Sequence, residues 1–92
     1  MGILNKLGMK MAIVKEAKIN DTHYTKWPFT VNEAWLCKTR TKEIVLRVDN
    51  KYYALNGSAK CNKKYLSIKK IIKPDYDALV ISKIIDLGLD LN

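Results

Sequence analysis

Two cysteines and one histidine are the side chains of this 92-residue chain best suited to covalent or metal chemistry. Cys37 and Cys61 stand 24 residues apart, and a bridge between them would stabilise the fold by about 3 kcal/mol through loop closure. In a reducing compartment both would stay free thiols, which is the state that we expect. Cys37 alternates with Trp35 along an apolar strand and should be buried and unreactive. Cys61 lies among lysines, which favour the thiolate and make it the more reactive thiol.

A soft-metal site is the second kind of chemistry to consider, because copper prefers sulfur and imidazole ligands. The candidate ligands are Met9, Met11, His23, Cys37 and Cys61. The sequence has neither a Cys-x-x-Cys nor a His-x-x-x-His pair, so no spacing brings these ligands together. Copper handling is therefore only the second alternative, and we expect no metal site and no cofactor.

The sequence offers few residues that could form a catalytic site. His23 is the only histidine, and no spacing sets it beside a nucleophile and an orienting group. The sequence has no glycine-rich phosphate loop, because Gly57 and Gly88 stand where structural elements should end. We predict that the protein is not an enzyme.

Electrostatics offers a different route to function, because the chain carries a net charge of +8. Residues 1–73 hold 16 basic and 5 acidic side chains, whereas residues 74–92 hold one basic and four acidic side chains. Such a basic body can attract an anionic partner. Only two of the basic residues are arginines, so phosphate binding would tolerate any base sequence. The candidate partner-binding residues lie between positions 60 and 73: Lys60, Lys63, Lys64, Lys69, Lys70, Lys73 and the aromatic Tyr65.

The clearest structural signal lies in residues 43–55, EIVLRVDNKYYAL, where apolar residues alternate on both sides of Asp49-Asn50. Both of these residues tolerate positive φ and can close a two-residue hairpin. The predicted register pairs Val48 with Lys51, Leu46 with Tyr53, and Ile44 with Leu55. One face of the hairpin then carries Ile44, Leu46, Val48, Tyr53 and Leu55. The other face carries Val45, Arg47, Tyr52 and Ala54. A slip by one residue would exchange the faces, so the pattern itself selects this pairing.

Weaker signals predict the other elements. Residues 12–19 are ambiguous between strand and helix, and residues 30–38 are typical of a strand. Asn56 can cap a short helix. Isoleucines at helical spacing predict a helix over residues 63–73, with a strand at 67–72 as the alternative.

The last element should be a helix that begins at Asp77 or Ser82, ends at Gly88 and is mostly buried. The expected core consists of Trp27, Pro28, Trp35, Leu46, Tyr53, Leu55, Ile81, Ile84 and Ile85. The predicted fold class is α+β, a small antiparallel β-meander with two or three short helices packed on one side. Residues 1–11 form an N-terminal extension and residues 12–92 a single domain.

Four stretches together resemble a family of small bacterial domains of unknown function, most of them exported. They are KWPFTV at 26–31, the Leu36-Cys37 pair, KYYALNGSAK at 51–60 and ISKIIDLGLDL at 81–91. The family has glycine at the position of Asn50 and a terminal cysteine at the position of Asn92. In exported relatives that cysteine could bridge to the position of Cys37, which is not possible here. The resemblance implies the fold, and some exported relatives are associated with copper handling.

By elimination, the sequence favours a small cytoplasmic binding module that acts through a protein–protein surface. An inhibitor or accessory factor from a phage or another mobile element is one form of such a module. The first alternative is sequence-tolerant nucleic-acid binding through the lysine-rich residues 60–73. The chain has no apolar run of the length that a membrane span needs, and it does not predict an oligomeric state.

Overall fold

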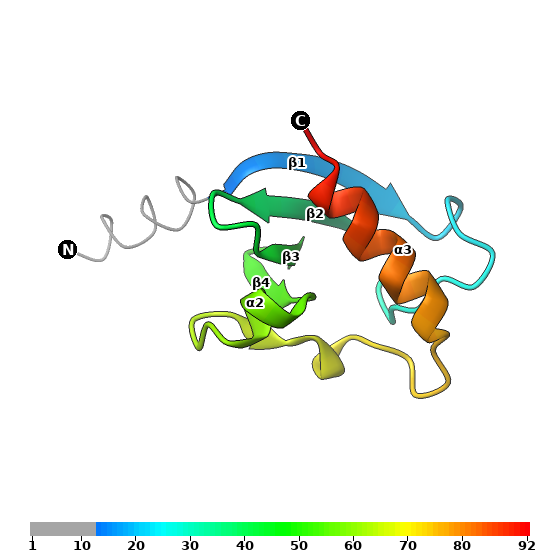
Figure 1. The fold of residues 1–92 in the computed structure, drawn as a ribbon. Coiled ribbons are helices and arrows are strands. Elements are labelled where there is room, and N and C mark those ends of the chain that lie inside the picture. Colours follow the sequence, from blue (N-terminus) through cyan, green and yellow to red (C-terminus); the bar gives the residue numbers. More distant parts are fainter. Residues whose placement is uncertain (1–12) are drawn as a thin grey trace.

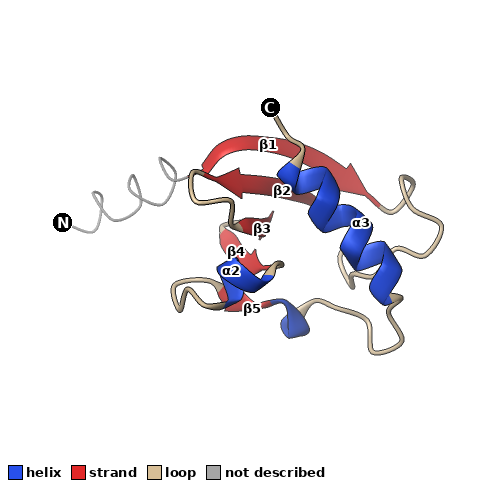
Figure 2. Cartoon of the chain, in the orientation of Figure 1, coloured by secondary structure: helices blue, strands red, loops and turns tan. Residues whose placement is uncertain are grey.

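The computed structural model describes residues 13–92, so the predicted extension over residues 1–11 lies outside the described residues. A five-stranded sheet in the order β1-β2-β3-β4-β5 forms the centre of the molecule (Figures 1 and 2). The strands are β1 (Ile13–Asn20), β2 (Glu33–Thr39), β3 (Ile44–Val48), β4 (Lys51–Ala54) and β5 (Leu66–Ser67). The helices are α2 (Gly57–Lys60), a 3₁₀ turn (Ile68–Lys70) and α3 (Ala78–Leu89).

The α+β class is confirmed, but the sheet is not a pure meander. The pairs β1–β2, β2–β3 and β3–β4 are antiparallel, whereas β5 runs parallel to β4. The connection through α2 causes this difference, because it returns the chain to the start of β4 before β5 begins. The helices also lie on opposite faces, which the prediction of one-sided packing missed. Ile84 of α3 belongs to the same core cluster as Leu36 and Leu46 on one face, and Ala59 of α2 belongs to a second cluster with Val45 and Ala54 on the other face.

The predicted hairpin is confirmed together with its register. Val48 pairs with Lys51, and Leu46 pairs with Tyr53. The amide of Leu55 donates to the carbonyl of Ile44 at 2.9 Å, which extends the pairing one residue beyond β4. The turn takes positive φ at Asp49 (57°), and among the described non-glycine residues only Lys42 shares this conformation.

The main core lies between the sheet and α3. Trp27, Pro28, Leu46, Tyr53, Leu55 and Ile84 are buried there as predicted, whereas Trp35, Ile81 and Ile85 are only partly buried. Phe29 was not predicted to be in the core but is 1% exposed. Its ring meets Trp27 edge to face at 5.2 Å.

Helix α3 begins after Asp77, whose side chain accepts a hydrogen bond from the amide of Leu79. The prediction that Gly88 ends this helix is wrong, because the helix continues to Leu89. A Cβ at Gly88 would lie 2.8 Å from Cγ2 of Ile44, so the glycine allows the helix to approach the sheet. The expectation of a mostly buried helix is also wrong: Leu79, for example, is 71% exposed. Only one side of a helix can contact a single sheet face.

The predicted helix over residues 63–73 is wrong as well. This segment forms the short strand β5 and the 3₁₀ turn before Pro74. Its isoleucines still reach the core, since Ile68 and Ile71 are each 7% exposed. Tertiary contacts rather than helical periodicity therefore decide this conformation. Within residues 13–92, no helix is long and apolar enough to cross a membrane.

Candidate functional site

The six candidate lysines are all exposed. They lie along an irregular segment, residues 60–73, and do not share a helix face. Lys60 ends α2, Lys63 and Lys64 lie in the following turn, and the other three lie in or just after the 3₁₀ turn. Residues 60–73 contain no acidic side chain. No ion pair within residues 13–92 includes any of the six lysines. The segment is therefore a strip of uncompensated positive charge.

Tyr65, the aromatic residue of this segment, is directed into the protein. It is 8% exposed, and its hydroxyl donates to Oε1 of Glu43 at 2.9 Å. Burial and the adjacent Glu43 raise the pKa of this phenol, so it remains a neutral donor. Asn62 Nδ2 donates to the other oxygen of Glu43 at 3.1 Å. These contacts fasten the lysine-rich segment to the residue before β3 and leave the Tyr65 ring unsuited to stacking on a base.

A second surface lies on the sheet face opposite α3. The pairing of the four antiparallel strands places side chains of adjacent strands in one row, because directly opposed residues point to the same face. That row consists of Lys18, Trp35, Arg47 and Tyr52. We call this row, together with Glu16, the open sheet face. None of its side chains is fully buried.

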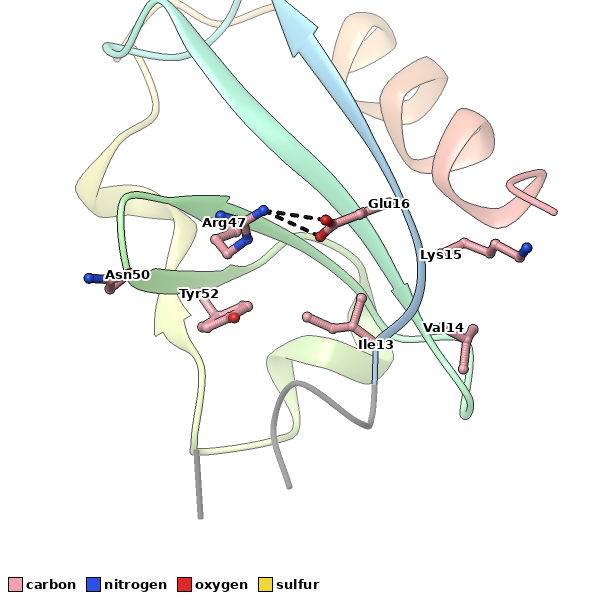
Figure 3. Close-up of a pocket in the computed structure, with 7 residues that line it drawn as sticks. All are labelled: Ile13, Val14, Lys15, Glu16, Arg47, Asn50 and Tyr52. Atoms are coloured by element: carbon pink, nitrogen blue, oxygen red, sulfur yellow. Dashed lines mark hydrogen bonds and ion pairs between the residues drawn. The ribbon is translucent and has the colours of Figure 1, made fainter. Parts of the chain in front are cut away.

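Arg47 is the central residue of the open sheet face. Its guanidinium lies 5.3 Å from the centre of the Trp35 ring, within the range of a cation–π contact. Its Nη2 lies 3.4 Å from both carboxylate oxygens of Glu16. Figure 3 shows Arg47, Glu16 and Tyr52 converging from β3, β1 and β4. The three side chains are among those that line a pocket of about 600 Å³. The guanidinium is thus held in place by contacts on two sides.

Cys37 points to this same face, where the side chain of Glu16 lies over it. It is 0% exposed and unbridged, as the sequence predicted, and its thiol donates to Oε2 of Glu16 at 3.6 Å. Burial, and then the negative charge of Glu16, raise the pKa of the thiol from 9.0 to about 12. The thiol is therefore protonated at neutral pH and is a poor nucleophile or metal ligand.

This shift predicts an effect of alkaline pH on stability. The raised pKa means that the folded state favours the protonated thiol, so the stabilisation is complete below pH 9 and is lost as the pH rises toward 12. Over that window the free energy of unfolding should decrease by up to about 1.4 kcal/mol per pH unit from this group alone. Urea unfolding of the wild type and of Cys37→Ala measures the difference between the slopes. Tyrosine and lysine ionisation contributes to both proteins, so equal slopes would contradict the prediction.

The other proposed metal ligands are not gathered around Cys37. Cys61 is an exposed free thiol in the turn after α2. His23 lies in the turn after β1, where its Nδ1 accepts from the amide of Asn20 at 3.3 Å. In the part of the chain that the structure describes, no three His, Cys, Asp or Glu side chains are grouped to hold a metal ion. Met9 and Met11 lie outside that part.

The open sheet face was not predicted from the sequence. The hairpin register already placed Arg47 and Tyr52 on one face, but Trp35 was assigned to the core. The missing information was the location of the C-terminal helix, because α3 covers the opposite face of β2.

The sequence and the fold were also compared with known proteins. No protein-family model, curated protein or solved structure matches this chain. The family resemblance therefore remains a prediction, and the two surfaces carry the information on function.

Proposed function

We propose that this protein is a non-enzymatic binding module that recognises another protein through its open sheet face. The observation that carries the proposal is the adjacent placement of Trp35, Arg47 and Tyr52 on three neighbouring strands. These three residue types are the ones most enriched where protein interfaces concentrate their binding energy. They are also partly pre-ordered here, because Arg47 is held between Trp35 and Glu16. Pre-ordered side chains lose less entropy when a partner binds.

The charges of this face favour a protein partner over a nucleic acid. Arg47 is paired with Glu16, and Lys18 Nζ lies 2.9 Å from a carboxylate oxygen of Glu33. The positive charges of the face are thus matched by carboxylates, which would repel phosphates. A partner would bind here by covering the Trp35 and Tyr52 rings rather than by neutralising charge.

The chemistry of the face also agrees with binding rather than catalysis. The thiol of Cys37 is buried and protonated beneath Glu16. His23, the one histidine of the chain, lies in the turn after β1, and its Nδ1 accepts a hydrogen bond from the amide of Asn20. A binding role requires neither a nucleophile nor a general base.

Nucleic-acid binding through residues 60–73 is the second candidate. It is favoured by the six exposed lysines, which have no ion-pair partner within the described residues. Because the Tyr65 ring is buried, this binding would consist of phosphate contacts without base stacking. It would therefore be independent of base sequence and would weaken with salt.

A pull-down from the native cell, with and without nuclease, distinguishes the two candidates. The baits are the wild type, an Arg47→Ala/Tyr52→Ala variant of the open sheet face, and a Lys63→Gln/Lys69→Gln/Lys70→Gln variant of the strip. Tyr76→Ala is the matched control, because it removes a tyrosine that is 46% exposed elsewhere. Each bait is first checked for an unchanged fold by its circular-dichroism spectrum.

The proposed function predicts a partner protein that is still recovered after nuclease treatment. Tyr76→Ala and the lysine variant should retain this partner, whereas Arg47→Ala/Tyr52→Ala should recover at least 10-fold less of it. Partners that disappear after nuclease and with the lysine variant would instead support nucleic-acid binding. Partners that are equally abundant on all four baits would contradict both proposals.

A further inference from the structure

We propose that two copies of the chain associate through strand β1 into a symmetric dimer with one continuous sheet. Strand β1 is eight residues long and forms an edge of the sheet, with β2 on one side and no partner strand on the other within residues 13–92. The backbone groups on such an edge can pair with a second strand. This inference does not depend on the proposed function.

The hydrogen bonds determine which residues of β1 point outward. The amide of Thr39 donates to the carbonyl of Glu43 on the β3 side, and backbone groups alternate in direction along a strand. On β2, residues 34, 36 and 38 therefore point toward β1, where they pair with Ile19, Ala17 and Lys15. The outward groups of β1 are consequently those of Glu16, Lys18 and Asn20.

The turn after β1 limits this free edge. The amide of Asn20 donates to Nδ1 of His23, and the carbonyl of Asn20 accepts from the amide of His23 at 3.1 Å. Near the other end, the register shifts between Ile13 and Lys15. The regular edge is thus centred on Ala17, with Glu16 and Lys18 as the residues that offer both backbone groups to a partner.

Charge then selects one register for a two-fold antiparallel pairing, in which the same surface of both copies is used. If the outward residues pair with one another, three registers are available. One opposes Glu16 with Glu16, one opposes Lys18 with Lys18, and one opposes Glu16 with Lys18. Directly opposed like charges destabilise a strand pair, whereas opposite charges stabilise it. Only the third register, with the two Ala17 residues facing each other, brings opposite charges together at both positions.

The intramolecular ion pairs extend this complementarity. Within one copy, Lys18 is paired with Glu33, and Glu16 is paired with Arg47. In the selected register these pairs join into a row of alternating sign: Glu33 and Lys18 of one copy followed by Glu16 and Arg47 of the second copy. The two-fold symmetry produces this row twice. Lysines on an edge strand commonly prevent pairing, but here each Lys18 meets a carboxylate.

The arrangement has a consequence for recognition. Two five-stranded sheets joined antiparallel at their β1 edges become one sheet of ten strands, and equivalent faces lie on the same side. The Trp35, Arg47 and Tyr52 side chains of both copies would therefore point in one direction. A dimer of this kind presents two copies of the open sheet face to a partner.

Sedimentation velocity over a range of concentrations tests the proposal with the full chain. We expect the wild type to shift with concentration from the 10.6 kDa monomer toward twice that mass. Glu16→Lys and Lys18→Glu should each lose this shift, because each variant opposes like charges in the selected register.

An equimolar mixture of the two variants should recover the dimer. In a mixed pair, one copy carries two positive side chains at these edge positions and the other copy carries two negative ones, so opposite charges face each other again at both positions. Lys51→Glu is the matched control and should dimerise as the wild type does. It changes the net charge by the same amount as Lys18→Glu but lies on β4.

Amide hydrogen exchange locates the contact independently of any substitution. In the dimer, exchange at Glu16 and Lys18 should slow by at least 10-fold as concentration rises, whereas exchange at exposed amides elsewhere should not change. A wild type that remains monomeric up to about 1 mM, where association would contribute only about 4 kcal/mol, would overturn the proposal. A dimer whose β1 exchange is independent of concentration, or variants that dimerise separately but not better together, would overturn it too.

Discussion

Replacing Phe29 with alanine should lower the free energy of unfolding by about 3–5 kcal/mol, the usual cost of removing a fully buried phenylalanine. Phe29 is 1% exposed and is among the largest of the fully buried side chains. Its ring contacts Trp27 edge to face, a geometry that stabilises beyond the area it buries. The backbone at Phe29 also bridges to Ile72, and the amide of Thr30 donates to the carbonyl of Ile71 at 2.7 Å. The buried ring thus lies where the backbone of the loop after β1 is joined to the segment before α3.

Urea unfolding monitored by tryptophan fluorescence measures this loss. Leu79→Ala is the control, because Leu79 is 71% exposed and its removal should change stability by less than about 0.5 kcal/mol. Losses of equal size for Phe29→Ala and Leu79→Ala would show that the loop does not pack on the core as described.

The parts of the fold that were predictable from the sequence are those that local chemistry decides. The hairpin over residues 43–55 has alternating side chains and a turn residue that tolerates positive φ, and both signals lie within 13 residues. Asn56 and Asp77 cap their helices by accepting hydrogen bonds from amides two or three residues later. None of these features needs a contact with a distant segment.

The errors occur where distant contacts decide. Residues 63–73 have helical periodicity, but the segment forms a strand and a turn. Pairing with β4 and the hydrogen bond from Tyr65 to Glu43 stabilise this conformation. Phe29 was overlooked because it lies outside regular structure and is fixed by a bridge to Ile72, which is distant in the sequence. No local pattern specifies such a contact.

The two candidate surfaces also differ in whether local sequence or distant contacts determine them. The lysine-rich strip is a matter of composition and was visible in the sequence, but the burial of Tyr65 was not. The open sheet face depends on which side of β2 the helix α3 covers. Trp35 and Leu36 are adjacent and apolar, and only packing against α3 makes Leu36 the core residue and leaves Trp35 to the open face.

The packing of α3 against the sheet leads to the second large effect. Gly88→Val should lower the free energy of unfolding by up to about 3 kcal/mol, because overpacking a filled core forces the helix or its neighbour to move. A Cβ at position 88 would lie 2.8 Å from Cγ2 and 3.1 Å from Cδ1 of Ile44. Ile44 is 0% exposed, and its Cγ2 is attached directly to the stiff Cβ branch, so it cannot rotate away freely. The gain in helix propensity over glycine, less than about 1 kcal/mol, is too small to offset the clash.

Gly57→Ala separates this steric effect from the loss of a glycine as such. A Cβ at Gly57 meets nothing within 4 Å, and the residue lies in α2 without positive φ. Alanine there should leave stability unchanged or raise it by up to about 1 kcal/mol, because it restricts the unfolded chain. Thermal and urea unfolding of both variants measure the contrast. If Gly88→Val were as stable as Gly57→Ala, the helix could not lie as close to β3 as Gly88 allows, and the burial of Ile84 between them would have to be abandoned as well.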